Sequence, residues 1–227
     1  MKVSEALGRD KQKRIGAKRL QQVPSLVACD QLLDMEEPVS GFVQESGSYS
    51  NRNWTDLVVE LSRFSSVKVL ECDFSAARFE EVAFVNCDFA NSSFDCPRWK
   101  SVDFEKTRLT GASFAEGVFE RCQFKETKAD LSSFRYTKIT KCDFVNCNLR
   151  EIDFQGAEMA EVRFRNCDLG GAQFSHAKFS QVDLRSSNIR GIGFSLSGLK
   201  GLIVDPMQCE TFARQLGLQV DSVIVDG

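Results

Sequence analysis

Large apolar side chains recur at every fifth position over most of this chain, from Trp54 to Val204. Of the 19 phenylalanines, 17 fall on these positions, and so do both tryptophans. An α-helix repeats every 3.6 residues and a strand repeats every two, so neither element produces this spacing. A short fixed repeat is typical of a solenoid, in which each unit turns the chain by a constant angle and places one large side chain in a shared interior.

Four units that each turn the chain by about 90° close one square coil, and such coils stack roughly 4.8 Å apart. Residues 20 positions apart then form a column on each side, which we name after its first member. The Trp54 column is aromatic throughout and comprises Trp54, Phe74, Phe94, Phe114, Phe134, Phe154, Phe174 and Phe194. The Phe64 column comprises Phe64, Phe84, Phe104, Phe124, Phe144, Phe164, Leu184 and Val204. The Val59 column (Val59 to Leu199) and the Val69 column (Val69 to Ile189) are mixed, and this separation favours four sides per coil.

The residue two positions before each large apolar residue is also expected to point inward, and it is mostly small or β-branched. The first members are Cys72, Ala77, Val82, Cys87 and Ser92. Together with the frequent aspartate directly before the large residue, this pattern resembles the pentapeptide-repeat family over about two thirds of the chain. The resemblance implies an all-β fold, a right-handed quadrilateral β-helix, over residues 51–204.

Residues 1–50 do not fit the repeat and are predicted to form an N-terminal cap or arm. A solenoid end exposes unpaired backbone and an apolar cross-section, so we expect part of this segment to cover the first coil. The apolar residues of Val23–Met35 indicate a short helix. The stretch from Gly41 to Ser50 is interpreted as a loop.

Residues 205–227 are predicted to form a C-terminal helix and tail. Asp205 is expected at the N-cap, Pro206 at the first helical position and Gln208 at the third, and Gly217 marks the helix end. Leu218–Val220 and Val223–Val225 indicate short strands. A helix of about 11 residues is marginal alone, so it should dock on the last coil or on a second copy of the chain.

The segment Pro206–Val220 is also similar to the C-terminal helix of the quinolone-resistance and gyrase-binding pentapeptide proteins, which joins two rods end to end. That resemblance implies a homodimer. Its expected contact residues are Met207, Phe212, Ala213, Leu216 and Leu218.

The repeat weakens at two places. Pro97 occupies a small inward position, and Ala129 replaces a bulky inward residue, which would leave a void. We expect Leu131 to fill that void by a local bulge. Residues 125–131 are therefore the best candidate for an irregular loop.

Composition limits the compartment and the chemistry. The net charge of −3 predicts neither direct nucleic-acid binding nor a strongly acidic protein, and no apolar run is long enough to span a membrane. Six of the nine cysteines (Cys72, Cys87, Cys122, Cys142, Cys147 and Cys167) occupy small inward positions, where a thiol packs as a small hydrophobe. The pairs Cys122/Cys142 and Cys147/Cys167 should stack one coil apart, near disulfide range. An interior crowded with thiols indicates a reduced, cytoplasmic protein.

The sequence contains no constellation of catalytic residues. It has no phosphate-binding glycine loop and no metal-ligand spacing, and its single histidine, His176, is expected at the surface with nothing paired to it. We therefore expect neither an enzyme nor a cofactor. A redox or metal role for the cysteine ladder is a minor alternative.

The outward charges distinguish one side of the predicted rod. The side of the Trp54 column, called the acidic face below, carries five carboxylates (Asp56, Asp73, Asp95, Glu116 and Asp153) and one base, Arg135, for a net charge of −4. The side of the Val59 column sums to +2, and the other two sides are near neutral. A surrogate for duplex DNA should be more strongly negative.

The family resemblance implies a non-enzymatic rod that binds a type II topoisomerase, DNA gyrase or topoisomerase IV, and modulates it or protects it from poisons such as quinolones. In the gyrase-binding relatives an acidic rod is held to mimic DNA, so the partner-binding residues implied here are Asp73, Asp95, Glu116 and Asp153. The alternative is a general interaction scaffold whose partner is recruited by residues 1–45.

Overall fold

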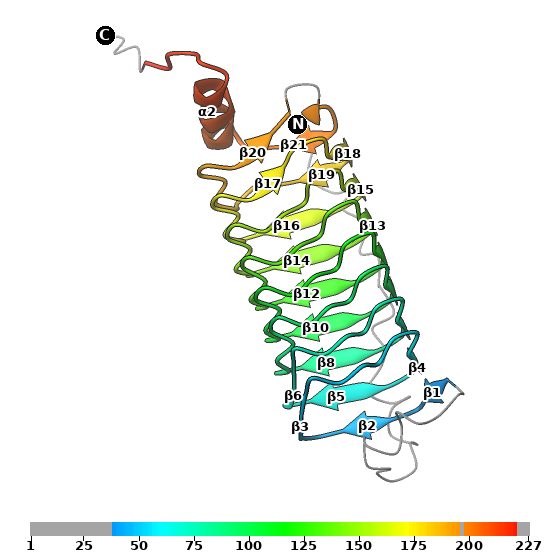
Figure 1. The fold of residues 1–227 in the computed structure, drawn as a ribbon. Helices are drawn as coiled ribbons and strands as arrows, with labels where there is room; N and C mark the ends of the chain where they lie inside the picture. The colour runs from blue at the N-terminus through cyan, green and yellow to red at the C-terminus, as the bar shows by residue number, and fades with distance from the viewer. Residues whose placement is uncertain (1–37, 196–197, 222–227) are drawn as a thin grey trace, which may run out of the picture.

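The described part of the chain is a rod of stacked coils with a single helix at its C-terminal end (Figure 1). The computed structural model describes residues 38–195 and 198–221. The helix expected at Val23–Met35 and the strand expected at Val223–Val225 lie outside these residues. The predicted all-β quadrilateral helix of about eight coils is confirmed.

Two sides of the rod are parallel sheets. The strands on the side of the Val59 column are β1 (Val39–Ser40), β4 (Val58–Glu60), β7 (Arg78–Glu80), β9 (Arg98–Lys100), β11 (Val118–Glu120), β13 (Lys138–Thr140), β15 (Glu158–Ala160) and β18 (Lys178–Ser180). The strands on the side of the Phe64 column are β2 (Val43–Gln44), β5 (Arg63–Ser65), β8 (Ala83–Val85), β10 (Asp103–Glu105), β12 (Gln123–Lys125), β14 (Asp143–Val145), β16 (Arg163–Arg165), β19 (Val182–Asp183) and β21 (Leu202–Ile203).

The other two sides pair mostly through single parallel bridges. Such bridges link Asn53, Asp73, Ser93, Ser113, Ser133, Asp153 and Gln173 in succession on the side of the Trp54 column. Short strand pairs complete these sides: β3 (Gly47–Ser50) with β6 (Val67–Leu70), and β17 (Gln173–Phe174) with β20 (Gly193–Phe194). On all four sides the paired residues are 20 positions apart, as predicted for a square coil.

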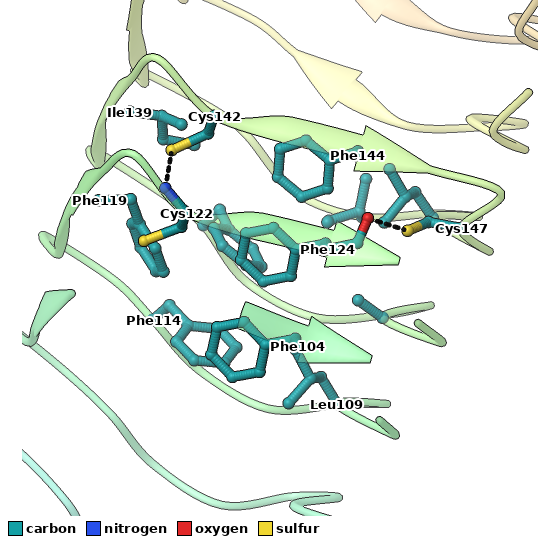
Figure 2. Packing of buried hydrophobic residues seen from close by; sticks show 14 of the residues in the cluster. Phe104, Leu109, Phe114, Phe119, Cys122, Phe124, Ile139, Cys142, Phe144 and Cys147 are labelled. Atoms are coloured by element: carbon teal, nitrogen blue, oxygen red, sulfur yellow. Dashed lines mark hydrogen bonds between the residues drawn. The ribbon is translucent and has the colours of Figure 1, made fainter. Parts of the chain in front are cut away.

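The interior is a set of stacked rings. Phe104 and Phe124 lie 4.7 Å apart between ring centroids with their planes 6° apart, and Phe124 and Phe144 lie 4.5 Å apart at 4° (Figure 2). Rings on neighbouring sides meet edge to face, as Phe84 and Phe89 do at 5.1 Å and 90°. Both geometries are preferred by aromatic pairs, so each column is held along the rod and across it.

The corners of the coil use a backbone conformation that the sequence pattern does not reveal. At most of the corner positions, two residues after a large inward residue, φ is positive. Of the described residues 25 that are not glycine adopt such a value, with φ from 48° at Leu61 to 65° at Ser186. This region disfavours side chains with a Cβ. The corner amides donate to the next coil, as Glu126 N does to the Val145 oxygen at 2.9 Å, and these hydrogen bonds offset the strain.

The prediction of an irregular loop at residues 125–131 is wrong. Bridges through Lys128 continue the pairing without a bulge, and Leu131 is 60% exposed at an ordinary corner with φ of 59°. Ala129 is buried in its column, where Phe124 and Phe134, from the neighbouring sides, approach to 6.4 Å edge to face. Their separation is close to the 6.5 Å between Phe144 and Phe154, which flank Leu149 in the same column, so the coil keeps its ordinary dimensions at Ala129. Pro97 is also buried without interrupting the coil, because Gly117 on the next coil has no Cβ to collide with its ring.

Pairing begins earlier than the repeat. The prediction of a loop over Gly41–Ser50 is wrong, because strands β2 and β3 lie within this stretch. Val39, Gln44 and Tyr49 pair with Val59, Phe64 and Val69, respectively. The five-residue spacing is therefore kept through the segment that the pattern assigned to a cap or arm. The sequence pattern did not reveal this spacing because Gln44, a polar residue, occupies a position that is apolar in the later coils.

The C-terminal helix, α2 (Pro206–Gln215), begins as predicted. Asp205 is its N-cap and forms a capping box with Gln208, and Gly217 follows the helix end with φ of 82°. Leu218–Val220 is irregular rather than the expected strand. Phe212 lies 5.0 Å from Phe194 between ring centroids, so α2 docks on the last coil.

Candidate interaction faces

The interior thiols of the described residues are structural. Each described cysteine is free, and no group of three or more potential metal ligands occurs in residues 38–195 and 198–221. The Cys147 thiol donates to the Phe124 oxygen at 3.3 Å, and the Cys142 sulfur accepts from Cys122 N at 3.3 Å (Figure 2). Burial raises the pKa of Cys87, and raises that of Cys122 further, which keeps both thiols protonated and unreactive.

The N-terminal half of the acidic face carries the uncompensated carboxylates. Asp73, Asp95 and Glu116 lie on three consecutive coils, and Asp56 lies on the coil before them. Within the described residues none of the four forms an ion pair. Since the coils stack about 4.8 Å apart, the four carboxylates span roughly 14 Å along the rod.

Local hydrogen bonds hold two of these carboxylates in place. Asp73 Oδ1 accepts from the backbone N of Ser75 at 2.9 Å and from its hydroxyl at 2.6 Å. Asp95 Oδ1 accepts from the hydroxyl of Ser113 on the next coil. Glu116 is exposed at a corner with φ of 58°. The face therefore offers two oriented carboxylates and one free one.

Asp153, the fourth predicted partner-binding residue, lies apart from the others. Arg135 on the preceding coil forms an ion pair with it at 3.5 Å between Nη1 and Oδ2, and Gln155 N donates to Oδ1 at 2.9 Å. Its charge is thus balanced locally. The structure brings together three of the four predicted residues and separates Asp153 from them by one coil that carries Arg135.

The C-terminal half of this face has a different character, which the sequence pattern did not reveal. Tyr136 is 53% exposed, its ring lies against Gly156 on the next coil, and Arg135 stands 5.7 Å from the ring centroid. His176 is exposed at the same corner position two coils beyond Tyr136. The sequence did offer one signal for this group of Arg135, Tyr136 and His176, namely a large aromatic residue, Tyr136, placed 20 positions before a glycine, Gly156.

The side of the Val59 column shows paired rather than free charges at several positions. Lys178 lies 2.8 Å from Glu158 and lowers the pKa of that carboxyl, and Lys100 pairs with Glu80 one coil apart. Exposed pairs of this kind add little stability, but they cancel the field of their charges. On the acidic face, by contrast, no base among the described residues pairs with Asp56, Asp73, Asp95 or Glu116.

The predicted dimerisation residues divide into two groups. Phe212 is buried against the last coil, and Ala213 is half-buried. Met207, Leu216 and Leu218 are 78%, 43% and 59% exposed, and Ile203 beside the helix is 41% exposed. The second group forms an apolar surface at the end of the rod. No helix among the described residues is long and apolar enough to cross a bilayer.

Comparison with known proteins agrees with the five-residue pattern. Residues 117–194 match the family model described as a pentapeptide repeat region. No curated protein sequence matches the chain.

Similar solved structures include QnrB1, a plasmid-mediated fluoroquinolone resistance protein, at 20% identity over 80% of this chain and 100% of that chain, with a TM-score of 0.45. HetL, a pentapeptide repeat protein involved in heterocyst differentiation regulation from the cyanobacterium Nostoc, is 14% identical over 71% of this chain and 90% of that chain, with a TM-score of 0.32. A pentapeptide repeat protein from the Arabidopsis thaliana thylakoid lumen is 12% identical over 46% and 66%, with a TM-score of 0.25. These likenesses concern the fold alone.

Proposed function

Starting from a chain that carries a pentapeptide repeat region and folds as a quadrilateral β-helix, we propose a non-enzymatic rod that binds a type II topoisomerase. DNA gyrase is the first candidate and topoisomerase IV the second. The bound rod modulates the enzyme or protects it from poisons such as quinolones. The observation that carries this proposal is the row of carboxylates at Asp73, Asp95 and Glu116.

This row is complementary to a surface that receives DNA. An enzyme that binds duplex DNA presents basic side chains to the phosphates, and carboxylates on consecutive coils of one face can contact the same side chains. One carboxylate per coil, about 4.8 Å apart, is a lower charge density than the duplex, which carries one charge per 1.7 Å or so of its axis. The proposed contact is therefore a local one over three coils, and Asp153, paired with Arg135, contributes less than the other three.

The apolar end surface supports a homodimer as the binding form. Met207, Leu216 and Leu218 surround the exposed side of α2, while Phe212 already caps the chain's own last coil. Two rods joined there would present two acidic faces to a two-fold symmetric enzyme. A reduced, cytoplasmic compartment fits the free cysteines of the interior.

The deciding experiment is a titration of the protein into a gyrase supercoiling assay, with and without a fluoroquinolone. The proposal expects inhibition, or protection from the drug, at near-stoichiometric amounts. The double variant Asp95→Lys/Glu116→Lys should lose the effect. The matched control Glu151→Lys/Glu161→Lys, which reverses two exposed corner carboxylates on other sides, should keep it.

A wild-type protein without effect well above stoichiometric amounts would rule out gyrase, and the same titration with topoisomerase IV would then decide the second candidate. If both variants behaved alike, the acidic face would not be the contact surface. If a variant with Met207, Leu216 and Leu218 replaced by polar residues still inhibited or protected gyrase, dimerisation would not be required.

A further inference from the structure

A shallow groove of about 490 Å³ follows one edge of the rod, where the side of the Phe64 column meets the side of the Val69 column. It runs over the corners directly after β5, β8, β10 and β12, which belong to four consecutive coils (Figure 1). The acidic face lies on another side of the coil. The lining residues are Ser66, Lys68, Asn86, Cys87, Asp88, Lys106, Thr107, Arg108, Glu126 and Lys128.

The five-residue repeat explains why a groove forms here. Two rows of outward side chains bound it, one at the corners and one two residues later, where parallel bridges link consecutive coils. The residue between the rows points into the rod and is small, and buried Cys87 and Thr107 form the floor. The corner row is Ser66, Asn86, Lys106 and Glu126, and the bridge row is Lys68, Asp88, Arg108 and Lys128.

The two rows carry a surplus of positive charge. The groove has a net charge of +2, because only two carboxylates, Asp88 and Glu126, line it together with three lysines and Arg108. Arg108 Nη1 lies 3.3 Å from Asp88 Oδ2, and Lys106 Nζ lies 3.9 Å from Glu126 Oε2. Both carboxylates are therefore engaged within the groove, and the surplus belongs to the two remaining lysines.

These two lysines lie at opposite ends of the groove. Lys68 and Lys128 are exposed, and neither side chain forms a hydrogen bond or an ion pair with residues 38–195 or 198–221. Three coil spacings separate them, or about 14 Å. Lys128 is also bridged to Arg108, and like charges side by side on adjacent strands are unfavourable. A carboxylate bound at this end would offset that repulsion.

An extended peptide with two acidic residues fits this arrangement. In an extended chain residues i and i+4 point to the same side and lie about 13 Å apart, at roughly 3.3 Å per residue. Acidic side chains at that spacing reach Lys68 and Lys128 together. The residue midway between them faces the ion pair of Asp88 with Arg108, where a small polar side chain fits.

A nucleic acid fits the groove less well than such a peptide. Its phosphates follow one another along the whole strand, so some of them would meet Asp88 and Glu126 as well as the lysines. A peptide can place carboxylates at the two ends of the groove and neutral groups between them. The charge pattern therefore favours a protein segment.

We propose that this groove binds an extended segment of a partner protein that carries two acidic residues four positions apart. One carboxylate pairs with Lys68 and the other with Lys128. The contact is separate from the proposed topoisomerase contact, because the acidic face lies on another side of the rod. One rod can hold both partners at once.

Fluorescence anisotropy at low salt tests this assignment with the full-length protein. The probe is a labelled peptide of serine and glycine with glutamates at positions i and i+4. The matched peptide has the same composition with glutamates at i and i+3, which point to opposite sides of an extended chain. We expect the first peptide to bind about fivefold more tightly, because only its two carboxylates reach both lysines.

Substitutions in the protein assign this preference to the groove. Lys68→Glu/Lys128→Glu should abolish it, and Lys68→Arg/Lys128→Arg should keep it. The matched control is Lys138→Glu/Lys141→Glu, which makes the same change in net charge at two exposed lysines away from the groove and should also keep it.

Three results would overturn the proposal. Equal affinity for the two peptides would mean that a general attraction of charges, and no defined spacing, governs binding. Absence of binding at millimolar protein would exclude the site. Tighter binding of a labelled oligothymidylate of similar length, lost in Lys68→Glu/Lys128→Glu, would assign the groove to a nucleic acid instead.

Discussion

The hydroxyl of Thr127 donates a hydrogen bond to the backbone oxygen of Phe104, one coil earlier, at 3.2 Å. The same bond recurs along this edge of the rod, from an inward thiol or hydroxyl to the carbonyl 23 residues before it. The donors are Cys87, Thr107, Thr127, Cys147, Cys167 and Ser187. Small inward residues that carry an O–H or S–H group therefore join consecutive coils, which explains why cysteine, serine and threonine share one column.

Replacement of Thr127 by valine should lower the free energy of unfolding by about 1 kcal/mol, because the shape is kept and one buried hydrogen bond is lost. Chemical denaturation of the two proteins measures the difference. Ser133→Ala, on the outer surface, is the control and should change stability by less. A stable Thr127→Val protein would show that packing alone decides this column.

The contact between Tyr136 and Gly156 predicts a cost for any side chain at position 156. A Cβ there would lie 2.5 Å from Tyr136 Cδ1, and the residue has φ of 69°. Gly156→Ala should therefore destabilise the protein by about 2 kcal/mol or more, from backbone strain and overlap together. In a Tyr136→Ala background the overlap is gone, and the same substitution should cost only the backbone part. Equal costs in both backgrounds would mean that the ring moves aside freely.

The buried thiols predict a loss of stability at alkaline pH. Burial raises the pKa of Cys87 and Cys122 above the ordinary value of a thiol, so at high pH the folded chain binds more protons than the unfolded chain. Stability is thus complete below the unfolded thiol pKa and falls as pH rises above it, by about 1.4 kcal/mol per pH unit for each thiol.

The matched variant Cys87→Thr/Cys122→Val uses residues already present in the same columns, Thr107 and Val102. Denaturation between neutral and alkaline pH should show a flatter decline for this variant than for the wild type. Cys96→Ser removes an exposed thiol and controls for the loss of a cysteine as such. Parallel declines in the wild type and the double variant would refute the assignment to these two thiols.

Substitutions in the buried and in the exposed residues of the C-terminal segment should affect stability and dimerisation separately. Phe212→Ala removes a ring packed on Phe194 and should destabilise the last coil by about 3 kcal/mol. Because coils interact with their nearest neighbours, hydrogen exchange should speed up at Gly193 N, which is bonded to the Ala172 oxygen, and little at central coils. Met207→Asp/Leu218→Asp should leave this exchange unchanged and shift sedimentation equilibrium from dimer to monomer. A wild-type protein that sediments as a monomer would remove the dimer from the proposed function.

The period and the number of sides could be predicted from the sequence because each large apolar residue fills one fixed place. The start of α2 was also predictable, since Asp205, Pro206 and Gln208 satisfy its first backbone groups locally. Pairing at Val39 to Ser50 was missed because Gln44 stands at an inward position. The regular path at Leu131 was missed because the backbone pairing through Lys128 continues although Ala129 lacks bulk, and backbone pairing leaves no trace in the side-chain spacing.

The sequence allowed the net charge of the acidic face to be predicted, but not the arrangement of its side chains. The position of Glu116 follows from the repeat, but the pairing of Asp153 with Arg135 depends on side-chain directions between coils.

The glutamines of α2 have a consequence for how these rods behave in a concentrated solution. Gln208 Nε2 donates to the oxygens of Leu184 and Ser187 at 2.7 and 2.8 Å, and Gln215 Nε2 donates to the oxygen of Ile192 at 2.8 Å. These carbonyls face the end of the rod, where the amides of a further coil would otherwise bind. A stack of parallel strands with an open end is a template for fibre growth. The helix therefore terminates the stack chemically, and a chain without α2 would be prone to polymerise end to end into filaments.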